Sequence, residues 1–238
     1  MAKGGRGGRR THSTTTNVQP TTPTTPISNV PMNVTPFTDT DAQQLRDDMD
    51  DIYDPDVTDA IKLYISDSNP NGDGYSHSQN LNYKLDNGMA LNPTEKFIDD
   101  NIQAGMHAIG KDTTLYRYAH DDILQAMGVA DYSKMTDAQL QKALVGTTFK
   151  TTSYTSFSYD PKKSPFAPGN ALGGGREVVI KANVGGNTKV VFGAKKQAEF
   201  VLNKGTNMKV TGIHYDGTYA TPRNSGTKPR VILDVETF

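Results

Sequence analysis

Apolar and polar positions follow different periods in the two halves of the chain. Between residues 39 and 110, apolar side chains recur every three or four positions, the spacing that gathers side chains on one helix face. One stripe comprises Val57, Ile61, Leu63 and Tyr64, and a second comprises Phe97, Ile98, Ile102, Met106 and Ile109. The first part of the ordered chain is therefore predicted to be helical.

Residues that favour helix starts stand before these stripes. Thr38 or Asp39 can cap a helix that continues to Tyr53, Pro55 stands near the start of the next one, and the segment Asn92-Pro93-Thr94 opens a third. Later in the chain, Thr136-x-x-Gln139 forms the pattern of a capping box at the start of residues 135–146. A shorter helical stretch is expected at 121–128.

After Lys111 the pattern changes to short segments rich in β-branched and aromatic residues, separated by Gly, Pro or Asn. The predicted strands cover residues 113–119, 147–158, 176–184, 197–203, 207–215 and 230–236. Helices followed by strands are typical of an α+β fold and argue against a wound parallel sheet.

The amino-terminal segment differs in composition from the rest. Residues 1–38 are Gly/Arg-rich and then Thr/Pro-rich, with few apolar side chains to offset the entropy of ordering them. We expect a disordered tail at 1–38 and one folded domain at 39–238. The tail is interpreted as a solvated tether; its alternative is a nucleic-acid or packaging role for the basic block GGRGGRR.

Composition excludes several classes. The 238 residues have a formal net charge of −1 and no cysteine, so disulfides and thiolate metal sites are impossible. No apolar stretch approaches the roughly 20 residues that span a bilayer, and no hydrophobic segment follows the basic start, so a secretory signal is not expected. The five histidines lack metal-ligand spacing. Asp67 to Gly72 imitates half of a calcium loop, but Ser78 stands where a bidentate glutamate is needed.

Three predicted strands carry candidate chemistry. Arg117 lies mid-strand, where a planar guanidinium can bind a phosphate or carboxylate; its alternative is a solvated edge residue. Ser156 and Ser158 share one strand face and can orient a neighbouring carboxylate, or they are ordinary edge-strand hydroxyls. Gln197 and Glu199 are expected on one face of the strand 197–203, where the alternative is a solvated strand end.

Together these segments, LYR at 115–117, YTSFS at 154–158 and QAE at 197–199, resemble the Arg-Ser-Glu class of mono-ADP-ribosyltransferases. That class includes the C3-like exoenzymes and the catalytic components of binary actin-modifying toxins. The resemblance extends from about residue 56 to 238. It implies two packed, roughly perpendicular antiparallel or mixed β-sheets with a cleft for NAD between them.

The resemblance also implies roles for individual residues. Arg117 would bind the phosphates of NAD, Ser156 would hold Glu199, and Glu199 would bond the 2′-hydroxyl of the nicotinamide ribose, without a metal. Ser158 would also line the NAD site. From the segment SQNLNYKL, which resembles an NAD-contacting helix of the family, Asn80 and Lys84 are the further candidates.

Gln197 bears on the acceptor. In this class, Gln-x-Glu implies a target other than arginine: an Asn- or Gln-type side chain or a guanine base, with protein favoured over nucleic acid. The expected setting is a toxin or phage effector in a host cytoplasm, or a virion-associated protein attached through residues 1–38. An NAD glycohydrolase and a non-catalytic virion-associated or interaction protein with the same fold are the alternatives.

Overall fold

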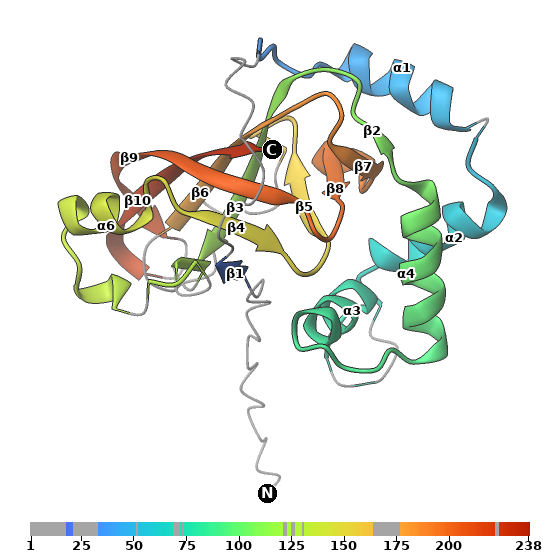
Figure 1. Ribbon diagram of the computed structural model, residues 1–238, viewed down its shortest axis with the longest axis horizontal. Coiled ribbons are helices and arrows are strands. Elements are labelled where there is room, and N and C mark those ends of the chain that lie inside the picture. Colours follow the sequence, from blue (N-terminus) through green and yellow to red (C-terminus); the bar gives the residue numbers. More distant parts are fainter. Residues whose placement is uncertain are drawn as a thin grey trace, which may run out of the picture.

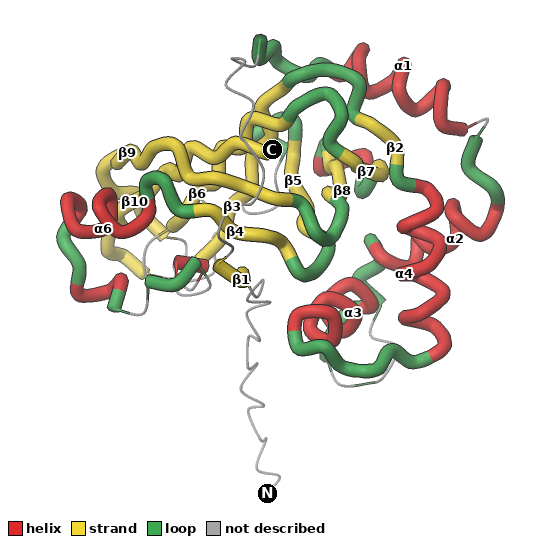
Figure 2. Tube along the Cα trace, in the orientation of Figure 1, coloured by secondary structure: helices red, strands yellow, loops and turns green. Residues whose placement is uncertain are grey.

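The computed structural model describes residues 18–20, 33–50, 52–68, 72, 74–120, 123–124, 127–129, 131–163, 177–221 and 224–238. After the short strand β1 (Val18–Pro20), four helices follow: α1 (Asp39–Asp50), α2 (Pro55–Tyr64), α3 (His77–Asp86) and α4 (Pro93–Gly105). Figure 2 shows α2, α3 and α4 gathered beside one end of the strands, with α1 apart from them. The predicted helical first part is confirmed.

Polar caps fix where these helices begin. Asp54 accepts a hydrogen bond from the N–H of Val57 at 2.9 Å and places Pro55 in the first turn of α2. Capping boxes start α3 at Ser76 and α4 at Asn92. The predicted box at Thr136 and Gln139 is present and starts α6 (Asp137–Leu144). Short polar side chains therefore set these boundaries, as the sequence indicates.

The helix α4 ends earlier than its apolar stripe predicts. It stops at Gly105, where a Cβ atom would lie 2.6 Å from Cγ1 of Val57, so α4 and α2 pack with almost no space between them. The chain then extends and pairs as β2 (His107–Ala108) with β7 (Lys189–Phe192). Ile109, expected on the helix face, is buried in the sheet core instead.

The other strands are β1 (Val18–Pro20), β3 (Thr113–His120), β4 (Thr148–Thr151), β5 (Thr155–Ser158), β6 (Glu177–Val184), β8 (Glu199–Leu202), β9 (Asn207–Thr221) and β10 (Asn224–Thr237). Two 3-10 turns, η1 (Tyr132–Lys134) and η2 (Lys195–Gln197), complete the described elements. The strand order is β1-β4-β9-β10-β6-β3-β5-β8-β7-β2. Among the described strands only β6 and β10 pair in parallel, so the sheet is mixed and the α+β class is confirmed.

The ten strands divide into two parts. A single residue pair, Tyr116 with Ser158, joins β3 to β5, whereas the neighbouring β3–β6 ladder is eight pairs long. In Figure 1, β9 and β10 run across the view and β5 crosses them steeply. The two sheets implied by the family resemblance therefore meet at this sparse joint.

Two apolar clusters lie on opposite faces of the smaller part. Phe200 and Leu202 of β8 enter the larger cluster, which fills the space under the main sheet, whereas Val201 enters a second one. That second cluster packs β7, β8 and the residue before β5 against the helices, and it contains Ala60, Tyr64, Leu81, Ile98, Ile102, Tyr154, Val191 and Val201. Alternation along β8 thus connects the two clusters.

Several predicted boundaries change. The expected tail ends too late at 38, because Phe37 is only 6% exposed and the N–H of Thr35 donates to the carbonyl of Asp112 at 3.1 Å. The strand expected at 147–158 is interrupted at 152–154, and β7 was not predicted. The remaining predictions for residues 1–17 and 21–32 lie outside the described residues. In the described part of the chain, no helix has the length and apolar character to cross a membrane.

Candidate active site

Glu199 begins β8 directly after a tight turn. Gln197 ends the 3-10 turn η2, and Ala198 adopts a left-handed conformation with φ of 49°. Ala198 is fully buried, and among the described residues it is the one non-glycine residue with a positive φ. Tertiary packing therefore holds it in this unfavourable conformation. The expectation that Gln197 and Glu199 share a strand face is wrong, because Gln197 lies before the strand.

The loop before η2 fixes the carboxylate of Glu199. Its Oε2 atom accepts a hydrogen bond from the N–H of Ala194 at 2.7 Å. A Cβ atom at position 193 would lie 2.3 Å from the same oxygen, so only glycine leaves room for the carboxylate there. The head of Glu199 is therefore held by backbone from 193–194, and its main chain by pairing with β5 and β7.

Arg117 and Ser156 lie together. The Nη1 atom of Arg117 donates to the carbonyl oxygen of Ser156 at 2.9 Å, which connects β3 to β5 close to their joint. The side chain of Ser156 lies near the hydroxyl of Tyr64 and slightly opposes the rise in the pKa of that hydroxyl. The carboxylate of Glu199 accepts a hydrogen bond from the N–H of Ala194, whereas the resemblance implied that Ser156 would hold it.

Ser158 supports the loop. It lies opposite Glu199 in the β5–β8 register and is 3% exposed. Its Oγ atom lies 2.7 Å from the carbonyl oxygens of both Gln197 and Asp160. The hydroxyl is thus used to hold the chain around Gln197, which is a different task from the predicted contact with NAD.

Tyr64, predicted as part of an apolar helix stripe, lies at the end of α2 and is buried near Glu199 and Arg117. Its hydroxyl accepts a hydrogen bond from Nδ2 of Asn82 at 3.0 Å. Burial raises the pKa of Tyr64 well above its usual value; the negative charge of Glu199 raises that pKa further, and the positive charge of Arg117 opposes it. One buried hydroxyl therefore lies within the electrostatic influence of Glu199, predicted to be catalytic, and of Arg117, predicted to bind NAD.

The predicted contacts from α3 have a different layout. The ammonium of Lys84 forms an ion pair with the buried Glu95 at 2.7 Å, at the start of α4. In the described part of the chain, Nδ2 of Asn80 is buried without a hydrogen-bond partner. The asparagine that reaches Tyr64 is Asn82, which also donates to the carbonyl of Tyr154 at 3.1 Å. The two asparagines are two residues apart and therefore point to different sides of α3, about 200° apart around its axis.

Surface charge surrounds Gln197. Lys195 and Lys196, in the same turn, are exposed, and Gln197 itself is partly exposed. Within the residues that the structure describes, no group of three or more His, Asp or Glu side chains is arranged to hold a metal ion. The chemistry available at this point is one fixed carboxylate, one guanidinium and neutral hydroxyl and amide groups.

Solved structures with this fold include the ADP-ribosyltransferase toxin Plx2a from Paenibacillus larvae, with 15% identity, a TM-score of 0.56 and coverage of 82% of this chain and 92% of that one. C3stau2 from S. aureus, solved with NAD, has 17% identity, a TM-score of 0.56 and coverage of 86% and 98%. The enzymatic component C2-I of the Clostridium botulinum C2 toxin has 16% identity and a TM-score of 0.57; 84% of this chain aligns with 48% of that one.

No curated protein sequence matches the chain. At 15–17% identity, the structural likenesses establish the fold. The sequence itself matches the ADP-ribosyltransferase exoenzyme family over residues 59–238, which include Arg117, Ser156, Gln197 and Glu199. The chain therefore belongs to the ADP-ribosyltransferase exoenzyme family, whose members are NAD-dependent ADP-ribosyltransferases.

Proposed function

We propose that this protein is a mono-ADP-ribosyltransferase in which Glu199 acts at the nicotinamide ribose of NAD and Gln197 faces the acceptor. The observation that carries the proposal is the fixed carboxylate of Glu199, bonded by the N–H of Ala194 and seated on Gly193. A side chain held by backbone before substrate arrives incurs no further reorganisation during the reaction.

The reaction needs stabilisation of positive charge. The bond between the nicotinamide nitrogen and C1′ of the ribose breaks, nicotinamide leaves with the electron pair, and C1′ becomes cationic. A carboxylate beside the ribose stabilises charge that develops only in the transition state. A lone pair of the acceptor then forms the new bond to C1′, and the acceptor loses its proton.

The neighbouring residues have supporting roles. The guanidinium of Arg117 suits a phosphate of NAD, because its charge is permanent and its planar fork presents several donors. Ser156 and Tyr64 form a neutral pair beside Glu199. Because the pKa of Tyr64 is raised, its hydroxyl stays protonated and can donate without adding negative charge that would repel the phosphates.

Gln197 supports a protein acceptor with an Asn- or Gln-type side chain, and disfavours arginine, because an amide offers a matching donor and acceptor but no charge for a guanidinium. Its backbone carbonyl is held by Ser158, while its side chain is partly exposed in a turn with two lysines. A guanine base is the alternative acceptor. Action as a toxin or phage effector fits a transferase whose target is a macromolecule of another cell.

The test uses the full chain, NAD labelled in its adenylate phosphate and a cell lysate. We expect label in a macromolecular fraction, and at least a 100-fold loss of labelling in Glu199→Gln, a change that keeps shape but removes the charge. The matched control is Glu236→Gln, at the far end of β10. Separate nuclease and protease treatment of the product identifies the acceptor class.

Free ADP-ribose without labelled macromolecule would indicate a glycohydrolase instead. Equal losses in Glu199→Gln and Glu236→Gln would remove the assigned role of Glu199. Wild-type protein that neither consumes NAD nor gains thermal stability from it would contradict the proposed activity.

A further inference from the structure

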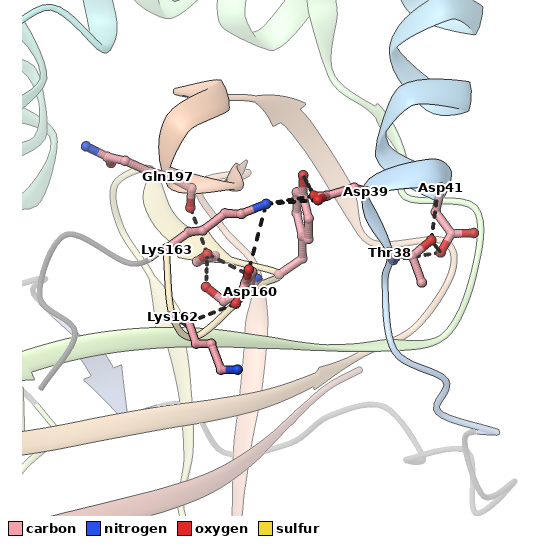
Figure 3. A network of polar contacts seen from close by, with 9 residues as sticks. Thr38, Asp39, Asp41, Asp160, Lys162, Lys163 and Gln197 are labelled. Carbon is pink, nitrogen blue, oxygen red and sulfur yellow. Dashed lines mark hydrogen bonds and ion pairs between the residues drawn. The ribbon is translucent and has the colours of Figure 1, made fainter.

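The helix α1 lies outside the matched residues 59–238 and contacts the segments that hold the Gln197 turn. At its first residue, Asp39 accepts hydrogen bonds from the hydroxyl of Tyr159 at 3.0 Å and from Nζ of Lys163, which lies 3.0 Å from each carboxylate oxygen. Figure 3 shows Lys163 reaching from the turn after β5 toward Asp39 on α1.

The partners of Asp39 belong to residues 158–163, the segment that supports the Gln197 turn. The N–H of Tyr159 donates to the carbonyl of Ala198 at 3.0 Å, and the preceding residue, Ser158, contacts the carbonyl of Gln197. The same Ser158 hydroxyl contacts the carbonyl of Asp160, three residues before Lys163. Residues 158–163 thus join α1 on one side to Gln197 on the other, as Figure 3 shows.

A second contact reaches the opposite end of the turn. The guanidinium of Arg46, two helical turns along α1, lies 4.0 Å from the ring centre of Phe192, the residue before Gly193. Phe192 is only 4% exposed, so the ring is a support for the loop and is covered from solvent. The helix α1 therefore contacts the residue before 193–198 directly, through Arg46, and supports the other end of that segment through Tyr159.

We propose that Asp39 is a positioning residue for the acceptor step: through Tyr159 and Lys163 it sets the orientation of the Gln197 turn. This inference rests on the proposed function. Glu199 is less affected, since its carboxylate is held by Ala194 and its backbone by β5 and β7. Loss of the Asp39 contacts thus lowers transfer to the acceptor more than cleavage of NAD.

Stability and positioning can be separated here. The side chain of Asp39 is 72% exposed and that of Lys163 is 38% exposed, and ion pairs of this kind contribute little to folding. An activity loss in a variant with an unchanged melting temperature therefore reports the position of the turn. A displacement of about 1 Å at a reacting group is enough to lower rates greatly.

The experiment measures two rates at saturating NAD: label incorporated into lysate macromolecules, and nicotinamide released without lysate. We expect Asp39→Ala to lower incorporation about tenfold while release changes less than twofold. Asp39→Asn should be intermediate, because its amide oxygen still accepts from Tyr159. Asp48→Ala is the control, since Asp48 is exposed on the same helix and accepts a hydrogen bond from Gln44 of that helix.

Equal falls in both rates, or incorporation that stays at the wild-type level in Asp39→Ala, would overturn the inference while leaving the transferase intact. A lower melting temperature in Asp39→Ala than in Asp48→Ala would assign the loss to folding and also overturn it. Failure of the proposed function has a different signature: wild-type protein then gives no incorporation at all.

Discussion

The larger apolar cluster and the smaller one beside the helices differ in whether their side chains include hydrogen-bonded polar groups. The larger cluster is built from aliphatic residues, methionines and phenylalanines, with rings such as Phe192 and Phe200 packed 5.0 Å apart. The smaller one includes two tyrosines whose hydroxyls are bonded: Tyr64 by Asn82, and Tyr154 by Asp99 and Gln103. The first cluster stabilises the sheet, and the second also places polar groups beside Glu199.

The polar contacts of the smaller cluster connect the helices to the strands. Asp99 of α4 accepts from Tyr154 at 2.7 Å and pairs with Lys204, whose Nζ atom lies 2.7 Å from Oδ2. Gln103 donates to the side chain of Asn203 at 2.6 Å. A partly buried network of this kind fixes orientation because an unpaired member is costly. The comparison predicts that changes in the two clusters will separate stability from activity.

The largest stability effect is expected in the larger cluster. Phe200→Ala removes a fully buried ring and should lower the free energy of unfolding by about 3–5 kcal/mol. Urea denaturation followed by circular dichroism measures this. Phe200→Leu, which keeps most of the volume, should cost less than half as much. The specific activity of the folded fraction should change little. A large loss of specific activity would contradict the prediction that the larger cluster acts on stability alone.

The substitution Gly193→Ala is expected to lower activity much more than stability. The added methyl group would meet Oε2 of Glu199 at 2.3 Å and displace the carboxylate, lowering the rate of NAD cleavage about 100-fold. The free energy of unfolding should change by less than about 1 kcal/mol, because the displaced group is the end of a flexible side chain. The control is Gly212→Ala on β9, where the added methyl group would likewise lie close to a carboxylate oxygen, that of Asp234 on β10 at 3.1 Å. Full activity in Gly193→Ala would contradict the fixed-carboxylate argument.

A smaller effect should separate two tyrosines of one cluster. Tyr64→Phe removes the hydroxyl that contacts Asn82 and lies near Ser156, and it should lower the rate of NAD cleavage about tenfold. Tyr154→Phe removes a hydroxyl bonded to Asp99 and should cost about 1–2 kcal/mol of stability, with a smaller change in rate. Steady-state kinetics and thermal melts on both variants test this, and the reverse ranking would be evidence against Tyr64 as a site residue.

The smallest effect concerns pH and His107 of β2. Burial lowers the pKa of His107 below its usual 6.5, so the folded state binds fewer protons than the unfolded state as pH falls below about 6.5. Stability is therefore expected to decrease on acidification from pH 7.5 to 5.5, by up to about 1 kcal/mol from this residue. His107→Gln should flatten that part of the pH profile. A slope unchanged by the substitution would assign the effect to other groups.

Local signals in the sequence predicted much of the fold. Cap residues such as Asn92 and Thr136 mark helix starts because their side chains bond nearby backbone N–H groups, a short-range effect. Local composition also predicted strands that overlap β3, β5 and β8, on which Arg117, Ser156 and Glu199 lie. The missed strand β7 is short and buried, and its pattern KVVF is compatible with several structures.

The sequence by itself determined that helices precede most of the strands, and it predicted Arg117, Ser156, Gln197 and Glu199 as residues of a family motif. Only the tertiary structure decided how they meet: Gln197 in a turn ahead of the strand, Glu199 on the backbone of 193–194, and Ser156 near the hydroxyl of Tyr64. The physical reason is the distance along the chain over which each interaction acts. Caps and strand propensity act over a few residues, whereas the left-handed Ala198 and the buried hydroxyl of Tyr64 depend on groups distant in the chain.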